Sequence, residues 1–190
     1  MLTPADHVPG PRQGEWTYDS YAALPDDGKR YEVIDGVLYM TPSPMEWHQR
    51  AATRLTTYLT IHVDFTGLGR VYATFDVELT PKDVVQPDVL VVLNKNLEKI
   101  RSSRIFGGPD LVVEIASPST AKLDRSKKYD LYAQAGVREY WIIEPTECTI
   151  EVLTLQESTY SLKGIFSGDD LLPSHVVPGF PVPVRKIFDR

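Results

Sequence analysis

A glutamate inside an otherwise apolar segment limits what this chain can fold into more than any other feature. The segment is Leu111–Ala116, in which Glu114 is the single polar residue. An ionised carboxylate in apolar surroundings costs free energy unless it is ion-paired, hydrogen-bonded or bound to a cation. A second apolar run, Val89–Leu93, begins directly after Asp88. Continuously apolar runs are typical of central strands covered on both faces, so the sequence predicts two such strands, each bringing one acid.

Local signals place the elements that precede these strands. A β-hairpin is expected at 31–40, because Asp35 and Gly36 suit a type I′ turn, whose two central residues need positive φ. Ser43 and Pro44, followed by a glutamate two residues later, resemble a helix start with serine as the N-cap and proline at the first position. Apolar periodicity predicts the other elements: a helix to Val63, an alternating strand at 71–79, a helix at about 123–135, a strand at 137–144, and a hairpin at 149–155 and 158–166.

This order of elements predicts an α/β fold. Its expected form is an αβββαβ core with a mixed central sheet and added N- and C-terminal β-hairpins. The length of 190 residues suits one domain, which we place at 17–190. Residues 1–16 are rich in proline, glycine and polar side chains, and we expect them to form a flexible N-terminal arm.

Composition excludes some classes of protein. The net charge of −6 argues against binding polyanions over the whole surface, but it permits a local basic patch. The single cysteine, Cys148, excludes an internal disulfide and suits a reducing compartment. No apolar stretch is long enough to span a bilayer, and the N-terminus lacks the apolar core of a signal peptide. We therefore expect a cytoplasmic protein with no membrane partner.

The two acids of the apolar strands are the main candidates for chemistry. If the strands are neighbours, Asp88 and Glu114 can point to one end of the same sheet face. Two carboxylates in a partly dry site repel each other unless a cation neutralises them, and hard oxygen ligands favour Mg²⁺. In the alternative interpretation, Asp88 is a turn residue after a proline and Glu114 faces solvent from an edge strand.

A lysine on the helix at 123–135 is expected to complete the site. Lys128 precedes Leu131 and Tyr132 by three and four residues, and these are the positions expected to pack inward. Lys127 should lie nearer the flank of the helix. A lysine aimed at two acids can stabilise negative charge on a phosphate, whereas the simpler alternative is a lysine whose stem packs on the core while its ammonium stays in water.

Two further side chains are weaker candidates. Glu32, on the expected hairpin, is either a third acid in the cleft or an ordinary cross-strand partner. His48 lies on the inner stripe of its helix, where a hydrogen-bonded core or capping histidine is more common than a catalyst. Basic segments on both sides of the acid strand suggest a local phosphate-binding rim, although a solvated helix face explains them nearly as well. These segments contain Lys95, Lys99, Arg101 and Arg104 before it and Lys122, Arg125 and Lys127 after it.

The motifs resemble a known group of nucleases. Pro87-Asp88, then Glu114-Ile115-Ala116, then a helix lysine is similar to the PD-(D/E)XK, restriction-endonuclease-like superfamily. A closer resemblance is to the Uma-type family of bacterial endonucleases, and it runs from about Trp16 to Phe180. The segments that carry it are Tyr31-Glu-Val-Ile-Asp-Gly36, Pro109-Asp-Leu-Val-Val-Glu-Ile-Ala-Ser-Pro-Ser-Thr120 and Glu139-Tyr-Trp141.

The resemblance implies a metal-dependent DNA endonuclease that hydrolyses phosphodiester bonds. Asp88, Glu114 and the backbone carbonyl of Ile115 would hold Mg²⁺, or Mn²⁺, and the metal would activate a water. The superfamily usually has a lysine two positions after the glutamate, where this chain has Ala116. Lys128 would supply the amine from the following helix instead.

Two other classes of function fit the same pattern. One is a catalytically silent DNA-binding or oligomeric interaction protein on the same fold, and the other is a small-molecule enzyme that uses the same carboxylate–metal site. A homodimer is also expected, because cleavage of two strands suits two-fold symmetry and the terminal hairpins offer free edges.

Overall fold

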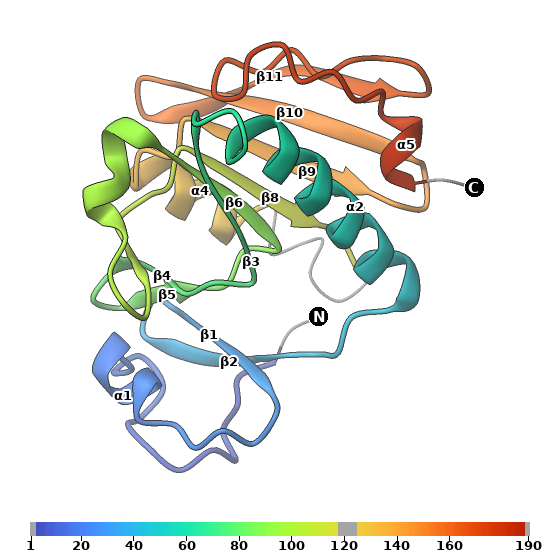
Figure 1. Cartoon of the computed structure of the whole chain (residues 1–190). Coiled ribbons are helices and arrows are strands. Elements are labelled where there is room, and N and C mark those ends of the chain that lie inside the picture. The colour runs from blue at the N-terminus through green and yellow to red at the C-terminus, as the bar shows by residue number, and fades with distance from the viewer. Residues whose placement is uncertain (1–2, 118–124, 189–190) are drawn as a thin grey trace.

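A six-stranded mixed sheet forms the centre of the computed structural model, which describes residues 3–117 and 125–188 (Figure 1). The strand order is β11-β10-β9-β8-β6-β3. Strands β8 and β9 pair in parallel and the other neighbours are antiparallel. The bounds are β3 Gly69–Ala73, β6 Val89–Leu93, β8 Leu111–Ile115, β9 Glu139–Glu144, β10 Thr149–Gln156 and β11 Thr159–Ser167. The predicted mixed central sheet and C-terminal hairpin are therefore confirmed.

A second sheet of five strands accompanies the first, and the sequence analysis did not foresee it. Its order is β2-β1-β5-β4-β7. The bounds are β1 Arg30–Ile34, β2 Val37–Thr41, β4 Val77–Thr80, β5 Asp83–Val85 and β7 Ile105–Phe106. The expected N-terminal hairpin is its β1–β2 edge, and its turn residues Asp35 and Gly36 have φ of 53° and 71°, as a type I′ turn requires. In Figure 1 this hairpin and α1 lie at the bottom, below the six-stranded sheet.

The single strand expected at 71–79 is wrong. Thr74 has φ of 54°, a left-handed conformation that interrupts an extended chain. The segment before it, β3, belongs to the six-stranded sheet, and the segment after it, β4, belongs to the five-stranded sheet. The chain returns through residues 86–88 between β5 and β6, and Thr74 N donates to Asp88 O at 3.4 Å. Two crossings between the sheets therefore lie side by side.

Four α-helices and one 3₁₀ segment complete the described fold: α1 Tyr18–Ala22, α2 Glu46–Val63, η1 Asn94–Lys99, α4 Lys127–Gln134 and α5 Arg185–Phe188. The expected N-cap of α2 is wrong, because Met45 caps the helix and Ser43 lies outside it. Met45 is still extended, with φ of −76° and ψ of 162°, so the helix begins at Glu46 and not at Pro44. The expected start of the α4 helix, Leu123, lies outside the described residues.

The two faces of the six-stranded sheet are covered by different layers. Odd-numbered side chains of β6 and β8 pack with α2 and α5 in one cluster. Even-numbered side chains of the same strands pack with α4 and with the five-stranded sheet in another. All five residues of each strand are buried, which is why both strands are continuously apolar apart from Glu114.

The N-terminal arm packs against the hairpin as far as the structure describes it. Ala5 N donates to Leu38 O at 2.8 Å, and Trp16 N donates to Gly36 O at 2.9 Å. Ala5 and Trp16 are both buried in a third cluster on the outer face of the five-stranded sheet. Among the described residues, no helix is both long enough and apolar enough to cross a membrane.

Candidate active site

A buried lysine lies between two buried glutamates where the two sheets meet. Lys128 Nζ is 2.9 Å from Glu32 Oε1 and 3.1 Å from Glu114 Oε1. The three residues are 3%, 3% and 4% exposed, so both ion pairs are shielded from solvent. Glu114 Oε1 also accepts a hydrogen bond of 2.6 Å from the hydroxyl of Tyr132, one turn after Lys128 on α4. The sequence analysis placed both α4 residues on the inner face, and the structure agrees.

Glu32 reaches this group from the five-stranded sheet. It lies on β1, opposite Tyr39 of β2, but its side chain does not serve only as a cross-strand partner. Glu32 Oε1 accepts a hydrogen bond of 2.9 Å from the backbone N–H of Gln86, in the crossing between β5 and β6. The cluster Lys128–Glu32–Glu114 therefore joins both sheets and α4.

Asp88 is held by a separate set of contacts. Strands β6 and β8 are antiparallel, and Val89 pairs with Val113. When this register is continued by one residue, Asp88 lies opposite Glu114. Residues opposite each other across an antiparallel pair share a face. Asp88 Oδ2 accepts a hydrogen bond of 2.9 Å from the N–H of Ile115 and lies 3.1 Å from His48 Nε2.

A partly exposed arginine and the histidine set the electrostatics of Asp88. Burial by itself would raise the pKa of Asp88, but the hydrogen bond and charge of His48, the Ile115 N–H and the charge of Arg30 together lower it below its usual value. Arg30 Nη1 is 3.9 Å from Asp88 Oδ1, while its Nε and Nη2 donate to the side-chain and backbone oxygens of Gln86 at 3.2 and 3.1 Å. Asp88 is thus held as a carboxylate.

Apart from Tyr132, these groups line one cleft of about 290 Å³, which we call the active-site cleft. Its walls include the five site residues expected from the sequence and the third expected metal ligand, Ile115. The link between β2 and α2, residues 42–45, forms another wall. The structure therefore brings together the residues Glu32, His48, Asp88, Glu114, Ile115 and Lys128.

The donor set of the cleft fits a hard divalent cation. Among the described residues, no three Asp, Glu, His or Cys side chains are grouped closely enough to enclose a metal. Mg²⁺ does not need such a cage, because it keeps several waters and is usually held by one or two carboxylates. Asp88 and Glu114 on one face, with the backbone carbonyl of Ile115, the residue after Glu114, would supply that kind of partial ligand set. Ala116 is buried and apolar, so it contributes no amine.

Arg30 and Gln86 are not among the site residues expected from the sequence, and Tyr132 was expected only to pack inward. Gln86 directly precedes the Pro87-Asp88 pair, which was the signal that could have found it. Three of the six described residues of the expected basic rim form ion pairs: Arg104 with Glu78, Arg125 with Glu151, and Lys127 with Asp35. Lys122 lies outside the described residues.

Two other buried acids, Glu139 and Asp110, are hydrogen-bonded to neighbouring segments of the fold. Glu139 accepts hydrogen bonds from Ser174 Oγ at 2.6 Å, from Val176 N at 3.2 Å and from the N–H of His175, so it anchors the C-terminal segment to β9. Asp110 accepts from Leu93 N at 2.9 Å and from the amide of Asn96. These two carboxylates are thus held by nearby donors and do not line the active-site cleft.

Comparison with known proteins decides the family. Residues 18–185 match the family model Uma2, described as "Putative restriction endonuclease". The chain belongs to the Uma2 family. An uncharacterized protein of Synechocystis, slr1290, is 27% identical over 126 residues, which span 65% of this chain and 65% of that protein. A crystal structure described as "a putative nuclease belonging to DUF820", from Anabaena variabilis, has a TM-score of 0.74 at 21% identity and covers 91% of this chain and 97% of its own.

These matches confirm the expected Uma-type resemblance and the restriction-endonuclease-like fold. The elements α2, β3, β6, β8, α4 and β9 follow the expected αβββαβ order, and β10–β11 extends the sheet. The likeness to the crystal structure concerns the fold alone. The roles of individual residues depend on the geometry described above.

Proposed function

We propose that this Uma2 protein is a Mg²⁺-dependent DNA endonuclease, with Mn²⁺ as a possible substitute, and that it hydrolyses phosphodiester bonds in the active-site cleft. The observation that carries the proposal is the Lys128 ammonium fixed between Glu32 and Glu114, with Asp88 opposite Glu114 on the neighbouring strand. Two acids and a lysine from the expected positions converge, although the usual lysine position holds Ala116.

Each side chain has a task that its contacts support. Asp88, Glu114 and the Ile115 carbonyl would hold the cation, which when bound supplies Lewis-acid chemistry and lowers the pKa of a water. His48 fixes the orientation of Asp88, and Tyr132 fixes that of Glu114. Lys128 is a preorganised positive charge for the negative charge that develops on the phosphate, because two acids hold it in place before substrate arrives.

Nicking of supercoiled plasmid tests the proposal. The parent protein should nick DNA with Mg²⁺ or Mn²⁺ and stop when EDTA is added. Asp88→Asn, Glu114→Gln and Lys128→Ala should each lose a factor on the order of 10²–10³ in rate. Lys127→Ala is the matched control, because its ammonium pairs with exposed Asp35 outside the cleft; it should still cleave and should weaken DNA binding mainly at low salt.

The main rival is a catalytically silent DNA-binding protein. A parent protein that binds DNA but never nicks it, in the presence of either metal, would favour that rival. Equal loss of cleavage in Lys127→Ala and Lys128→Ala would contradict the assignment of the amine.

We also propose a homodimer in which sheet edges pair. Strand β11 is an edge of the six-stranded sheet and exposes Leu162 and Ile165. An exposed strand edge with apolar side chains can pair with a second copy. Light scattering at micromolar concentration should give twice the mass of one chain, and a monomer would contradict this.

A further inference from the structure

Strand β1 directs two charged side chains, Arg30 and Glu32, into the active-site cleft. Side chains two residues apart on a strand lie on the same face of the sheet, and both residues line the cleft. Glu32 pairs with Lys128, which also pairs with Glu114. Arg30 instead approaches Asp88. The same strand therefore supplies a charged side chain to the surroundings of each proposed metal ligand.

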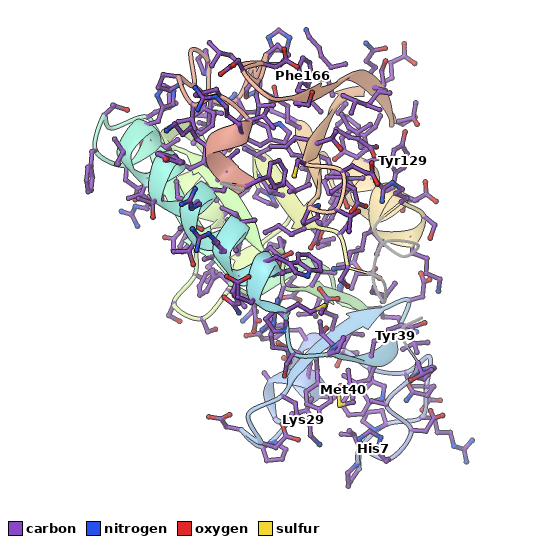
Figure 2. The ribbon with its side chains drawn as sticks, turned by 90° about the vertical axis from the view of Figure 1, so that its right-hand side faces the viewer. His7, Lys29, Tyr39, Met40, Tyr129 and Phe166 are labelled. Carbon is purple, nitrogen blue, oxygen red and sulfur yellow. The ribbon has the colours of Figure 1, made fainter. Side chains whose placement is uncertain are left out.

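The hairpin geometry decides where Arg30 lies. Arg30 is the first residue of β1, at the open end of the β1–β2 hairpin, where the chain leaves β2 for α2. Figure 2 shows this hairpin, on which Tyr39 and Met40 are labelled, close to the N-terminal end of α2. His48 belongs to the first turn of α2 and also contacts Asp88. Asp88 is thus approached both from the hairpin and from α2.

The two carboxylate oxygens of Asp88 have different surroundings. Oδ2 accepts the hydrogen bond from the N–H of Ile115 and contacts His48. Oδ1 accepts no hydrogen bond from the residues that the structure describes, because Arg30 Nη1, at 3.9 Å, is too far away to donate one. Asp88 is only 8% exposed, so little bulk water can replace that bond. Buried carboxylates are normally paired or bound to a cation, and Oδ1 is the oxygen left for one.

Gln86 holds the guanidinium of Arg30 in this position. The side-chain and backbone oxygens of Gln86 accept hydrogen bonds from Arg30 Nε and Nη2 at 3.2 and 3.1 Å. The amide nitrogen of Gln86 is itself fixed by Asp76 Oδ1 at 2.7 Å and by the hydroxyl of Tyr21 at 3.1 Å. Movement of the guanidinium away from Asp88 would cost its two hydrogen bonds to Gln86. Arg30 is therefore a fixed positive charge that faces Asp88 Oδ1.

A fixed positive charge in this position opposes the binding of a second one. Mg²⁺ lies ~2.1 Å from its oxygen ligands, so a cation on Asp88 Oδ1 would be at most about 6 Å from Arg30 Nη1. At that distance, repulsion between charges of +1 and +2 lowers the affinity for the cation about tenfold even at the dielectric constant of water. The effect is larger in a cleft that is partly shielded from water, because the effective dielectric constant there is lower.

We propose that Arg30 sets the metal affinity of the cleft: it balances the charge of Asp88 when no divalent cation is bound, and it competes with such a cation for Asp88 Oδ1. The inference rests on the proposed metal site and adds a residue outside the ligand set that controls it. It has an unusual consequence. Removal of the Arg30 charge should make the cleft a better metal site, whereas removal of a ligand makes it a worse one.

Titration with Mn²⁺ alone, without DNA, tests the proposal. Electron paramagnetic resonance measures free Mn²⁺ at about 0.1 M salt, where exposed charges more than about 10 Å apart are largely screened. Arg30→Gln and Arg30→Met both remove the charge, whereas Arg30→Lys keeps the charge and loses the planar fork. Lys127→Gln is the matched control, because it removes the same charge from a side chain that pairs with exposed Asp35 outside the cleft. Asp88→Asn, alone and with Arg30→Gln, shows whether the bound ion is at Asp88.

The neutral variants should differ from the charged ones. Arg30→Gln and Arg30→Met should each bind Mn²⁺ about tenfold more tightly than the parent, or more tightly still. Arg30→Lys and Lys127→Gln should stay within about threefold of the parent, because the first keeps the charge and the second removes a screened one. Adding Asp88→Asn to Arg30→Gln should abolish the gain. Circular dichroism of every variant checks that it is folded.

The outcomes separate this inference from the proposed function. Tighter Mn²⁺ binding by the neutral Arg30 variants that depends on Asp88 supports the inference, even if plasmid is never nicked. Neutral variants that bind Mn²⁺ like the parent, or not at all, overturn it, even if the parent cleaves DNA. An equal gain in Arg30→Lys or Lys127→Gln also overturns it, as does a gain that persists after Asp88→Asn.

Discussion

Replacing Lys128 by methionine should destabilise the fold far more than the same change at Lys127. Methionine keeps the length and apolar stem of the side chain but removes the ammonium. Lys128 is 3% exposed, and its loss leaves the carboxylates of Glu32 and Glu114 facing each other in a buried site. Removing one partner of a buried ion pair typically costs about 3–5 kcal/mol.

The expected effect is large enough to measure in two ways. For a domain of this size, 1 kcal/mol shifts the melting temperature by about 2–4 °C, so the variant should melt roughly 6–20 °C below the parent. Urea unfolding in EDTA, followed by the fluorescence of the buried Trp16 and Trp141, should give the loss of about 3–5 kcal/mol with an unchanged dependence on urea concentration.

Two comparisons make the result specific. Lys127→Met should stay within about 1 kcal/mol of the parent, because its pair with Asp35 is largely exposed and such pairs contribute little. Adding Glu32→Gln to Lys128→Met should recover part of the loss, since it removes one of the two repelling charges. A Lys128→Met protein within about 1 kcal/mol of the parent would refute the reasoning, and so would a double variant less stable than the single one.

Three further predictions concern the surroundings of the cleft. Because the pKa of Asp88 in the folded protein lies below the ordinary value of 3.8, Asp88 stabilises the fold above that pH and loses this contribution as the pH falls through the folded pKa. The gap in unfolding free energy between the parent and His48→Ala should therefore shrink below about pH 4, and acid titration of both proteins measures it. Tyr132→Phe removes the hydrogen bond to Glu114 and should lower the nicking rate about 10- to 100-fold while circular dichroism stays unchanged. Glu139→Gln places an amide among several N–H donors and should cost about 2–3 kcal/mol in urea unfolding, with normal metal-dependent nicking by the protein that remains folded.

The parts of the fold that sequence could predict are those set by local chemistry. Burial on both faces makes β6 and β8 continuously apolar, so their existence and central position could be inferred. The Asp35-Gly36 turn needs two positive φ values, and few other dipeptides supply them. Helical spacing was enough to place Lys128 inward, because Leu131 and Tyr132 share its face.

The second sheet could not be predicted in this way. The alternation at 71–79 is the same whether the residues form one strand or two, and the break depends on the left-handed conformation of Thr74. A threonine carries no signal for that conformation, unlike a glycine. β4 and β5 form a local hairpin, but its place in the second sheet depends on pairing with β1 and β7, which are distant from it in sequence. The two crossings between the sheets, and hence Gln86 and Arg30 in the site, were hidden for the same reason.

The pairing pattern also explains why three acids can share one cleft. The sequence predicts Lys128 beside Asp88 and Glu114. In the structure, Lys128 pairs with Glu32 and Glu114. Asp88 instead contacts His48 and Arg30. Leaving His48 aside, the three carboxylates and the two cationic side chains Lys128 and Arg30 sum to a net charge of −1. A divalent cation would change that charge to +1, and one phosphodiester group would then bring it to zero. A cleft with its acids unpaired would carry −3 and would repel DNA even with a divalent cation bound, so the two internal cations are what would make the site compatible with the proposed phosphate substrate.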